Sequence, residues 1–116
     1  MSQTSQDSSR RFRRRTVRVL VDYCAADGVR CEYATTLGAG GLFVETALPS
    51  PPDSQLELRF RLAEGLGLHE IAGRVVWVRG TEREQHTRSP GMGIQFTDSA
   101  GCSALARDLE LLEQHS

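Results

Sequence analysis

The chain has 116 residues, enough for one domain, and its net charge at pH 7 is −1. No apolar run approaches the roughly 18 residues of a membrane-spanning helix, and the three cysteines lack the CxxC spacing of a zinc site. The charge is uneven: six arginines against one acid give residues 1–18 a net charge of +5, and eight arginines against fourteen acids give residues 19–116 a net charge of −6.

The N-terminal segment combines a polar tail with an arginine-rich arm. Residues 1–9 are small and polar, and they are predicted to be disordered because they have nothing to bury. Residues 10–16 form the arm, and the chain has no lysine, so every basic side chain is a guanidinium. A guanidinium binds phosphate oxygens, or the O6/N7 edge of a guanine, through two parallel hydrogen bonds. The arm therefore predicts binding to an anion or an acidic partner, and the alternative is a solvated tail.

Alternating apolar and polar residues predict a β-domain over residues 17–98. The expected strands are residues 17–23, 29–37, 42–44, 55–62, 71–78 and 92–96. Glycines at three of the four positions 38–41 indicate either unusual backbone angles or a close approach to the backbone. Gly73 is expected to form a bulge, Trp77 is expected to anchor the core, and residues 80–91 are expected to form a charged loop.

The chain then changes to a helical pattern over residues 99–114. Leu105, Leu109 and Leu112 recur at helical spacing and form an expected buried stripe, with Ser99 or Ser103 as the expected N-cap. Six short strands followed by one amphipathic helix are typical of a mainly β fold. This fold would be a small antiparallel barrel or sandwich, with the helix covering an opening or an edge.

Residues that could carry catalysis are scarce. The histidines are expected in a turn, in a loop and near the C-terminus, without a partner at a recognisable spacing, and they are His69, His86 and His115. No phosphate-binding glycine motif occurs either. The cysteines are expected to be reduced, partly buried thiols of a cytoplasmic protein, and they are Cys24, Cys31 and Cys102. The sequence therefore predicts a protein that is not an enzyme and has no metal or cofactor.

Four segments in a fixed order resemble a PilZ domain. They are RRFRR at 10–14 with the strand that ends at Tyr23, TLGAGGLFVET at 36–46, RVVWVR at 74–79 and PGMGIQFTD at 90–98. The resemblance covers about residues 10–112. It implies a six-stranded antiparallel β-barrel with a C-terminal helix, and a regulatory domain whose ligand is cyclic di-GMP.

The family binds this dinucleotide through an RxxxR segment and a [D/N]xSxxG segment. The resemblance assigns RxxxR to Arg10 and Arg14, which leave the usual number of residues before the first strand. The other possible registers use Arg11 with Arg15, or Arg14 with Arg18. In the family these arginines clamp the phosphates and read the guanine edges, which suits a guanidinium better than an ammonium.

The second motif departs from the family pattern. With Gly41 as the anchor, Thr36 stands at the Asp/Asn position and Gly38 at the Ser position, and Gly40 precedes the anchor. Thr36 offers one short hydroxyl to the guanine N–H groups, and Gly38 offers no side chain. The backbone amides of this glycine run remain available to a phosphate.

These features predict a PilZ-type adaptor that acts through protein–protein contacts, with weakened or lost cyclic di-GMP binding. Its partners would belong to machinery such as that of motility or polysaccharide synthesis. One alternative is a working cyclic di-GMP receptor in which the arginine-rich arm compensates for Thr36 and Gly38. A lower-ranked alternative is nucleic-acid binding through the arm, which the acidic body disfavours.

Overall fold

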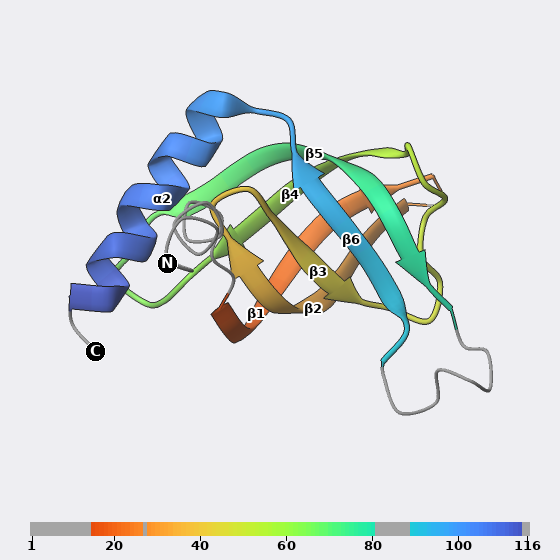
Figure 1. Ribbon diagram of the computed structural model, residues 1–116, viewed down its shortest axis with the longest axis horizontal. Helices are drawn as coiled ribbons and strands as arrows, with labels where there is room; N and C mark the ends of the chain where they lie inside the picture. Colours follow the sequence, from red (N-terminus) through yellow and green to blue (C-terminus); the bar gives the residue numbers. More distant parts are fainter. Residues whose placement is uncertain (1–14, 27, 81–88, 115–116) are drawn as a thin grey trace, which may run out of the picture.

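Six antiparallel strands close into a barrel in the order β1-β2-β3-β6-β5-β4 (Figure 1). The computed structural model describes residues 15–26, 28–80 and 89–114. The elements are β1 (Arg15–Ala25), β2 (Gly28–Gly38), β3 (Gly41–Glu45), β4 (Gln55–Arg61), β5 (Leu68–Arg79), β6 (Gly91–Phe96) and α2 (Ser99–Gln114). Pairing of β1 with β4 closes the sheet. The expected six-stranded barrel with a C-terminal helix is therefore confirmed.

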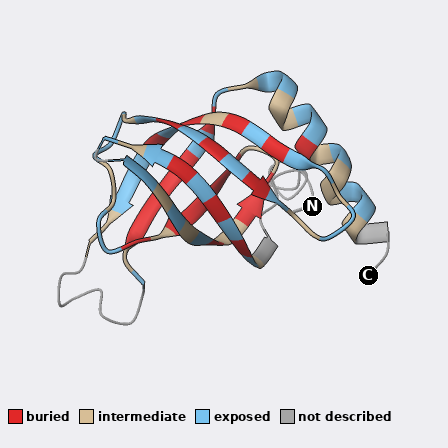
Figure 2. Cartoon of the chain, turned by 180° about the vertical axis from the view of Figure 1, so that it is seen from behind, coloured by how far each residue is buried: buried red, intermediate tan, exposed pale blue. Residues whose placement is uncertain are grey.

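Alternation of apolar and polar residues, clearest in β4, places one apolar side in the barrel interior. In β4, Leu56, Leu58 and Phe60 are buried and the residues between them are exposed. Buried and exposed residues also occur in bands along other strands (Figure 2), but the first four residues of β3 and of β6 are all buried. Burial of these side chains is the main force that holds the barrel closed.

Helix α2 begins at a carboxylate cap and lies at one end of the barrel (Figure 1). Asp98 Oδ1 accepts a hydrogen bond from the Gly101 N–H at 3.1 Å, and Asp98 is therefore the N-cap. The prediction of Ser99 or Ser103 was wrong, because the residue before the helix already satisfies its first amides and places a negative charge at its positive end.

Leu105 is the most deeply inserted residue of this helix. It is 0 % exposed, and Leu109 packs against the same core while Leu112 is half-buried. The expected apolar stripe is therefore present, and its depth decreases towards the C-terminus.

A histidine–aspartate pair joins α2 to β5. His69 lies in β5, is 7 % exposed, and its Nε2 is 2.8 Å from Asp108 Oδ2. The expectation that His69 lies in a turn without an acidic partner was wrong, because the two residues meet only when the helix packs on the barrel. His86 and His115 lie outside the described residues, as do the predicted tail at 1–9 and positions 81–88 of the predicted charged loop.

Two expectations about β5 were also wrong. The register is regular at Gly73 and shifts between Val75 and Trp77 instead. A glycine is needed at Gly73 because a Cβ there would lie 2.6 Å from Ile94 Cγ2. Trp77 is 39 % exposed, on the outside of the barrel and not in its core.

The three cysteines are free thiols, and the expected partial burial is right for Cys102 and wrong for Cys24 and Cys31. Cys24 and Cys31 are exposed, because they lie at outward positions of β1 and β2, and only Cys102 is half-buried. Within the described residues, no group of side chains has the arrangement of a metal site. In the same part of the chain, no helix has the length and apolar character needed to cross a membrane.

Candidate functional site

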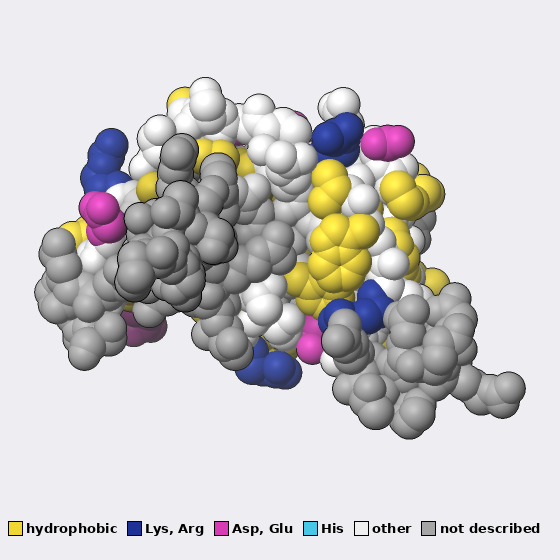
Figure 3. All heavy atoms as spheres, in the orientation of Figure 1, with side chains coloured by type: hydrophobic (Ala, Val, Ile, Leu, Met, Phe, Trp, Pro, Cys, Tyr) yellow, Lys and Arg dark blue, Asp and Glu magenta, His cyan; other side chains and the backbone are white. Residues whose placement is uncertain are grey.

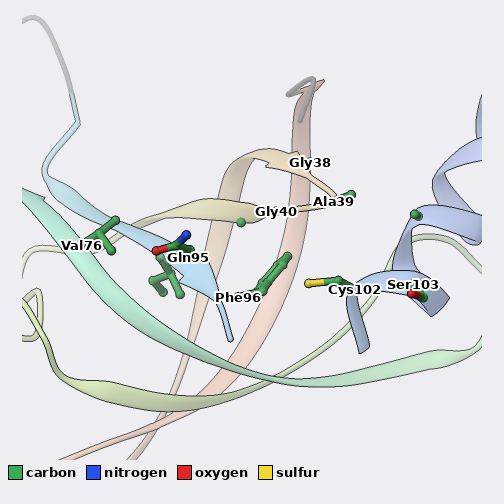
Figure 4. A pocket seen from close by; sticks show the side chains of 11 residues that line it. Gly38, Ala39, Gly40, Val76, Gln95, Phe96, Cys102 and Ser103 are labelled. Atoms are coloured by element: carbon green, nitrogen blue, oxygen red, sulfur yellow. The ribbon is translucent and has the colours of Figure 1, made fainter. Parts of the chain in front are cut away.

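A pocket of ≈ 570 Å³ lies between the β2–β3 hairpin, β6 and the first turns of α2 (Figure 4). Its volume is within the range of small-molecule sites. Its lining residues are Gly38, Ala39, Gly40, Gly41, Val76, Ile94, Gln95, Phe96, Cys102, Ser103 and Ala106. Three of the glycines singled out in the sequence therefore line one pocket.

The strand pairing places Thr36 and Gly38 on neighbouring rows of the outer barrel face. The first row, across β2, β3, β6 and β5, is Thr36, Phe43, Gly93 and Trp77. The second row, across the same strands, is Gly38, Gly41, Gln95 and Arg74. Directly paired residues point to the same face, and so do residues two apart on one strand. Thr36 is half-buried and does not line the pocket.

A stacked aromatic pair, an exposed Trp77 and a buried Phe43, adjoins the pocket on the first row. The rings of Trp77 and Phe43 stack with centroids 5.2 Å apart, across a glycine at 93 whose Cβ would lie 2.2 Å from Trp77 Nε1. The Arg79 guanidinium is 4.5 Å from the Phe43 ring centroid. Hydrophobic side chains flanked by basic ones gather over β5 and β6 in Figure 3. Trp77, which the sequence analysis expected in the core, is therefore part of the outer surface of the barrel.

Close packing explains the anchor glycine of the hairpin. A Cβ at Gly41 would lie 2.2 Å from the Ile94 carbonyl oxygen, so β3 and β6 could not pair at their present distance. Among the described glycines, positive φ angles occur at Gly28 and Gly65, and none occurs at positions 38–41. Unusual backbone angles were therefore the wrong explanation. A close approach is the right one for Gly41, and the approaching group belongs to the chain itself.

The arginine-rich arm is attached next to this hairpin. Arg10, Arg11 and Arg14 lie outside the described residues, and Arg15 begins β1. Arg15 pairs with Leu37, the residue before Gly38.

The described lining of the pocket is neutral. Its polar side chains are Gln95, Cys102 and Ser103. Burial, assisted by the negative charge of Asp98, raises the pKa of the Cys102 thiol, so this side chain stays uncharged at neutral pH. An anionic ligand would therefore have to find its counter-charges outside these lining residues.

Sequence reasoning missed Gln95 and the wall that α2 contributes. Outward alternation in β6 could have predicted that Gln95 is exposed, but no local signal relates it to Gly41. Cys102 and Ser103 lie more than sixty positions after the glycine run, and only the packing of α2 brings them to the pocket.

Comparison with known proteins identifies a family that shares this architecture. Residues 8–111 match the PilZ domain family, and no curated protein sequence matches the chain. The inhibitor of motility MotI/DgrA from Bacillus subtilis is similar in structure, with a TM-score of 0.71 and 16% identity over 90% of this chain. This chain spans 51% of the length of that protein.

Two isolated PilZ domains are also similar. The one from YcgR of Escherichia coli, solved with c-di-GMP, has a TM-score of 0.62 and 10% identity, covering 90% of this chain and 94% of that one. The one from CeSA of a cellulose-synthesizing bacterium has a TM-score of 0.55 and 17% identity, covering 84% of this chain and 97% of that one. The family consists of regulatory and binding domains and not of enzymes, which confirms the non-enzymatic expectation. The family match over residues 8–111 and the six-stranded barrel together show that this chain belongs to the PilZ domain family.

Proposed function

We propose that the protein is a regulatory adaptor of cyclic di-GMP signalling that acts through contacts with other proteins and binds the dinucleotide weakly or not at all. The observation that carries this proposal is the chemistry of the β2–β3 hairpin. In the register that the family resemblance implies, Thr36 and Gly38 stand at the Asp/Asn and Ser positions that contact the guanine, and the described residues that line the adjoining pocket are neutral.

The expected loss of affinity follows from the groups that these positions lack. A carboxylate at Thr36 and a hydroxyl at Gly38 would each accept or donate a hydrogen bond to the base. Each lost contact costs roughly 0.5–1.5 kcal/mol if it is neutral and roughly 1.5–3 kcal/mol if it is charge-assisted. Two losses amount to about 2–4 kcal/mol, or about thirty- to a thousand-fold in the dissociation constant.

Isothermal titration of the full chain with cyclic di-GMP tests the proposal. We expect weak or undetectable binding by the natural sequence and at least about thirtyfold tighter binding by the double variant Thr36→Asp, Gly38→Ser. Ala47→Asp is the matched control, because it adds a carboxylate at an exposed position beyond the far end of β3. Tight binding by the natural sequence, or no gain in the double variant, would contradict the proposal.

A second candidate, a working receptor, is favoured by the pairing of Arg15 with Leu37. This pairing places Arg15, at the described end of the arm, beside the strand that leads into the hairpin. This candidate predicts tight binding by the natural sequence that Arg10→Ala or Arg14→Ala abolishes. Arg59→Ala, an exposed position on β4, is the control and should leave affinity unchanged. Retained affinity in both arm variants would exclude this candidate.

The partner is proposed to be a protein of the motility or polysaccharide machinery, and the location is proposed to be the cytoplasm. The similarity to a structure described as an inhibitor of motility supports the first point. Affinity purification of the tagged chain from cells with high and low cyclic di-GMP tests the first point. Identical recovery of a partner at both levels is expected of an adaptor that does not sense the messenger.

A further inference from the structure

Gln95 is the one long polar side chain among the described residues that line the pocket. It lies in β6, pairs with Gly41 on one side, and pairs with Arg74 on the other. Figure 4 shows its amide group between Val76 and Phe96, on the side of the strand where the pocket lies. Because Gly41 has no side chain, nothing on that neighbouring position of β3 covers the amide.

We propose that Gln95 is the residue that recognises the guanine base in this pocket, and that it supplies hydrogen-bonding groups which Thr36 and Gly38 lack. The inference rests on the proposed function, because it takes cyclic di-GMP as the ligand. According to this inference, the side chain that contacts the base belongs to β6 and not to the β2–β3 hairpin.

The chemistry of a carboxamide fits the edge of a guanine. Guanine presents N1–H and N2–H donors next to the O6 acceptor, and a carboxamide presents an acceptor oxygen next to an NH₂ donor. Gln95 Oε1 therefore accepts from N1–H while Nε2 donates to the neighbouring O6. Both bonds are neutral, which agrees with weak binding and not with the charge-assisted binding of a carboxylate.

Arg74 acts as a positioning residue for this amide. Its Nη2 donates to Gln95 Oε1 across 3.5 Å, and its Nη1 is 3.5 Å from Asp53 Oδ1. The contact uses one of the two lone pairs of Oε1, so one remains for a ligand. It also distinguishes the oxygen of the amide from its nitrogen, since a guanidinium has no acceptor.

Gln55 offers a matched control. It is exposed on β4 and pairs with Arg74 from the opposite side, so it has the same side chain and the same arginine neighbour as Gln95. It does not line the pocket. A change at Gln55 therefore tests for effects that do not depend on the pocket.

Calorimetric titration of the full chain tests the inference with two ligands, cyclic di-GMP and its inosine analogue, which lacks the N2 amino group. Gln95→Leu and Gln55→Leu are each made in the natural sequence and in the Thr36→Asp, Gly38→Ser background. We expect Gln95→Leu to weaken cyclic di-GMP binding about tenfold, equivalent to about 1.4 kcal/mol, and Gln55→Leu to leave it unchanged. Gln95→Leu should weaken binding of the inosine ligand by a similar factor, because its base keeps the N1–H and O6 groups that the amide contacts.

Each outcome decides one point. If a background binds cyclic di-GMP and Gln95→Leu leaves its affinity for both ligands unchanged, the inference is overturned, and the adaptor proposal then depends on the affinity of the natural sequence alone. If the natural sequence binds tightly and Gln95→Leu weakens binding, the inference stands and the proposal of weak binding fails. If neither background binds, the inference is overturned. Side-chain amide ¹H–¹⁵N signals provide a second measurement, because those of Gln95 should shift on ligand addition and those of Gln55 should not.

Discussion

Truncation of Leu105 tests whether one side chain holds α2 against the barrel. Leu105 is 0 % exposed, and it is the one fully buried side chain in the described part of the helix. Leu105→Ala removes three carbon atoms, worth about 2.4 kcal/mol of transfer free energy, and the remaining cavity raises the cost to about 3 kcal/mol. The pocket should change as well, since α2 supplies one of its walls.

Urea unfolding followed by circular dichroism measures this cost. We expect a lower midpoint with an unchanged m-value if α2 stays docked around the cavity, and a lower m-value if the helix detaches in the native state. Leu111→Ala is the matched control, because Leu111 lies on the same helix and is 38 % exposed. Its cost should stay below about 1 kcal/mol. Equal costs for the two variants would refute the anchoring role of Leu105.

Three further predictions concern the hairpin, the helix cap and the core. Gly41→Ala should destabilise the fold by about 1–3 kcal/mol, because the added Cβ meets a backbone oxygen of β6. Gly67→Ala is the control and should change stability by under about 0.5 kcal/mol, because its Cβ would have open space around it. Equal melting temperatures of the two variants would contradict the clash. Asp98→Ala should cost about 1 kcal/mol in thermal unfolding and Asp98→Asn only a few tenths, and a neutral Ala variant would argue against the cap. Burial, assisted by the negative charge of Glu32, raises the pKa of Tyr23 to about 12, so the contribution of its neutral hydroxyl to folding stability is intact below pH 10 and is lost as the pH rises towards 12. Between pH 10 and pH 12 the free energy of unfolding should therefore fall by about 2 kcal/mol less in Tyr23→Phe than in the natural sequence. Parallel stability–pH curves for the two proteins would disprove this assignment.

Local sequence patterns predicted the strands, because the alternation of buried and exposed side chains along one strand can be read from residues that are neighbours in sequence. The alternation of Leu56, Leu58 and Phe60 identifies the inner face of β4 without any knowledge of its partners. The same reasoning failed at Trp77, where a register shift against β6 changes which side of the strand faces outward. That shift depends on how two strands pair, and the residues of one strand do not encode it alone.

The sequence by itself predicted a mainly β fold, a C-terminal helix and the glycine run, because alternation, helical spacing and short motifs act over a few residues. The choice of a barrel over a sandwich came from the PilZ resemblance. Only the tertiary structure decided that Gln95 and the start of α2 share a pocket with the β2–β3 hairpin, and that His69 meets Asp108 across 39 positions of sequence. Closure of the barrel and packing of the helix bring these groups together through burial of the common core. Such contacts depend on the whole set of strand partners, and no single segment specifies them.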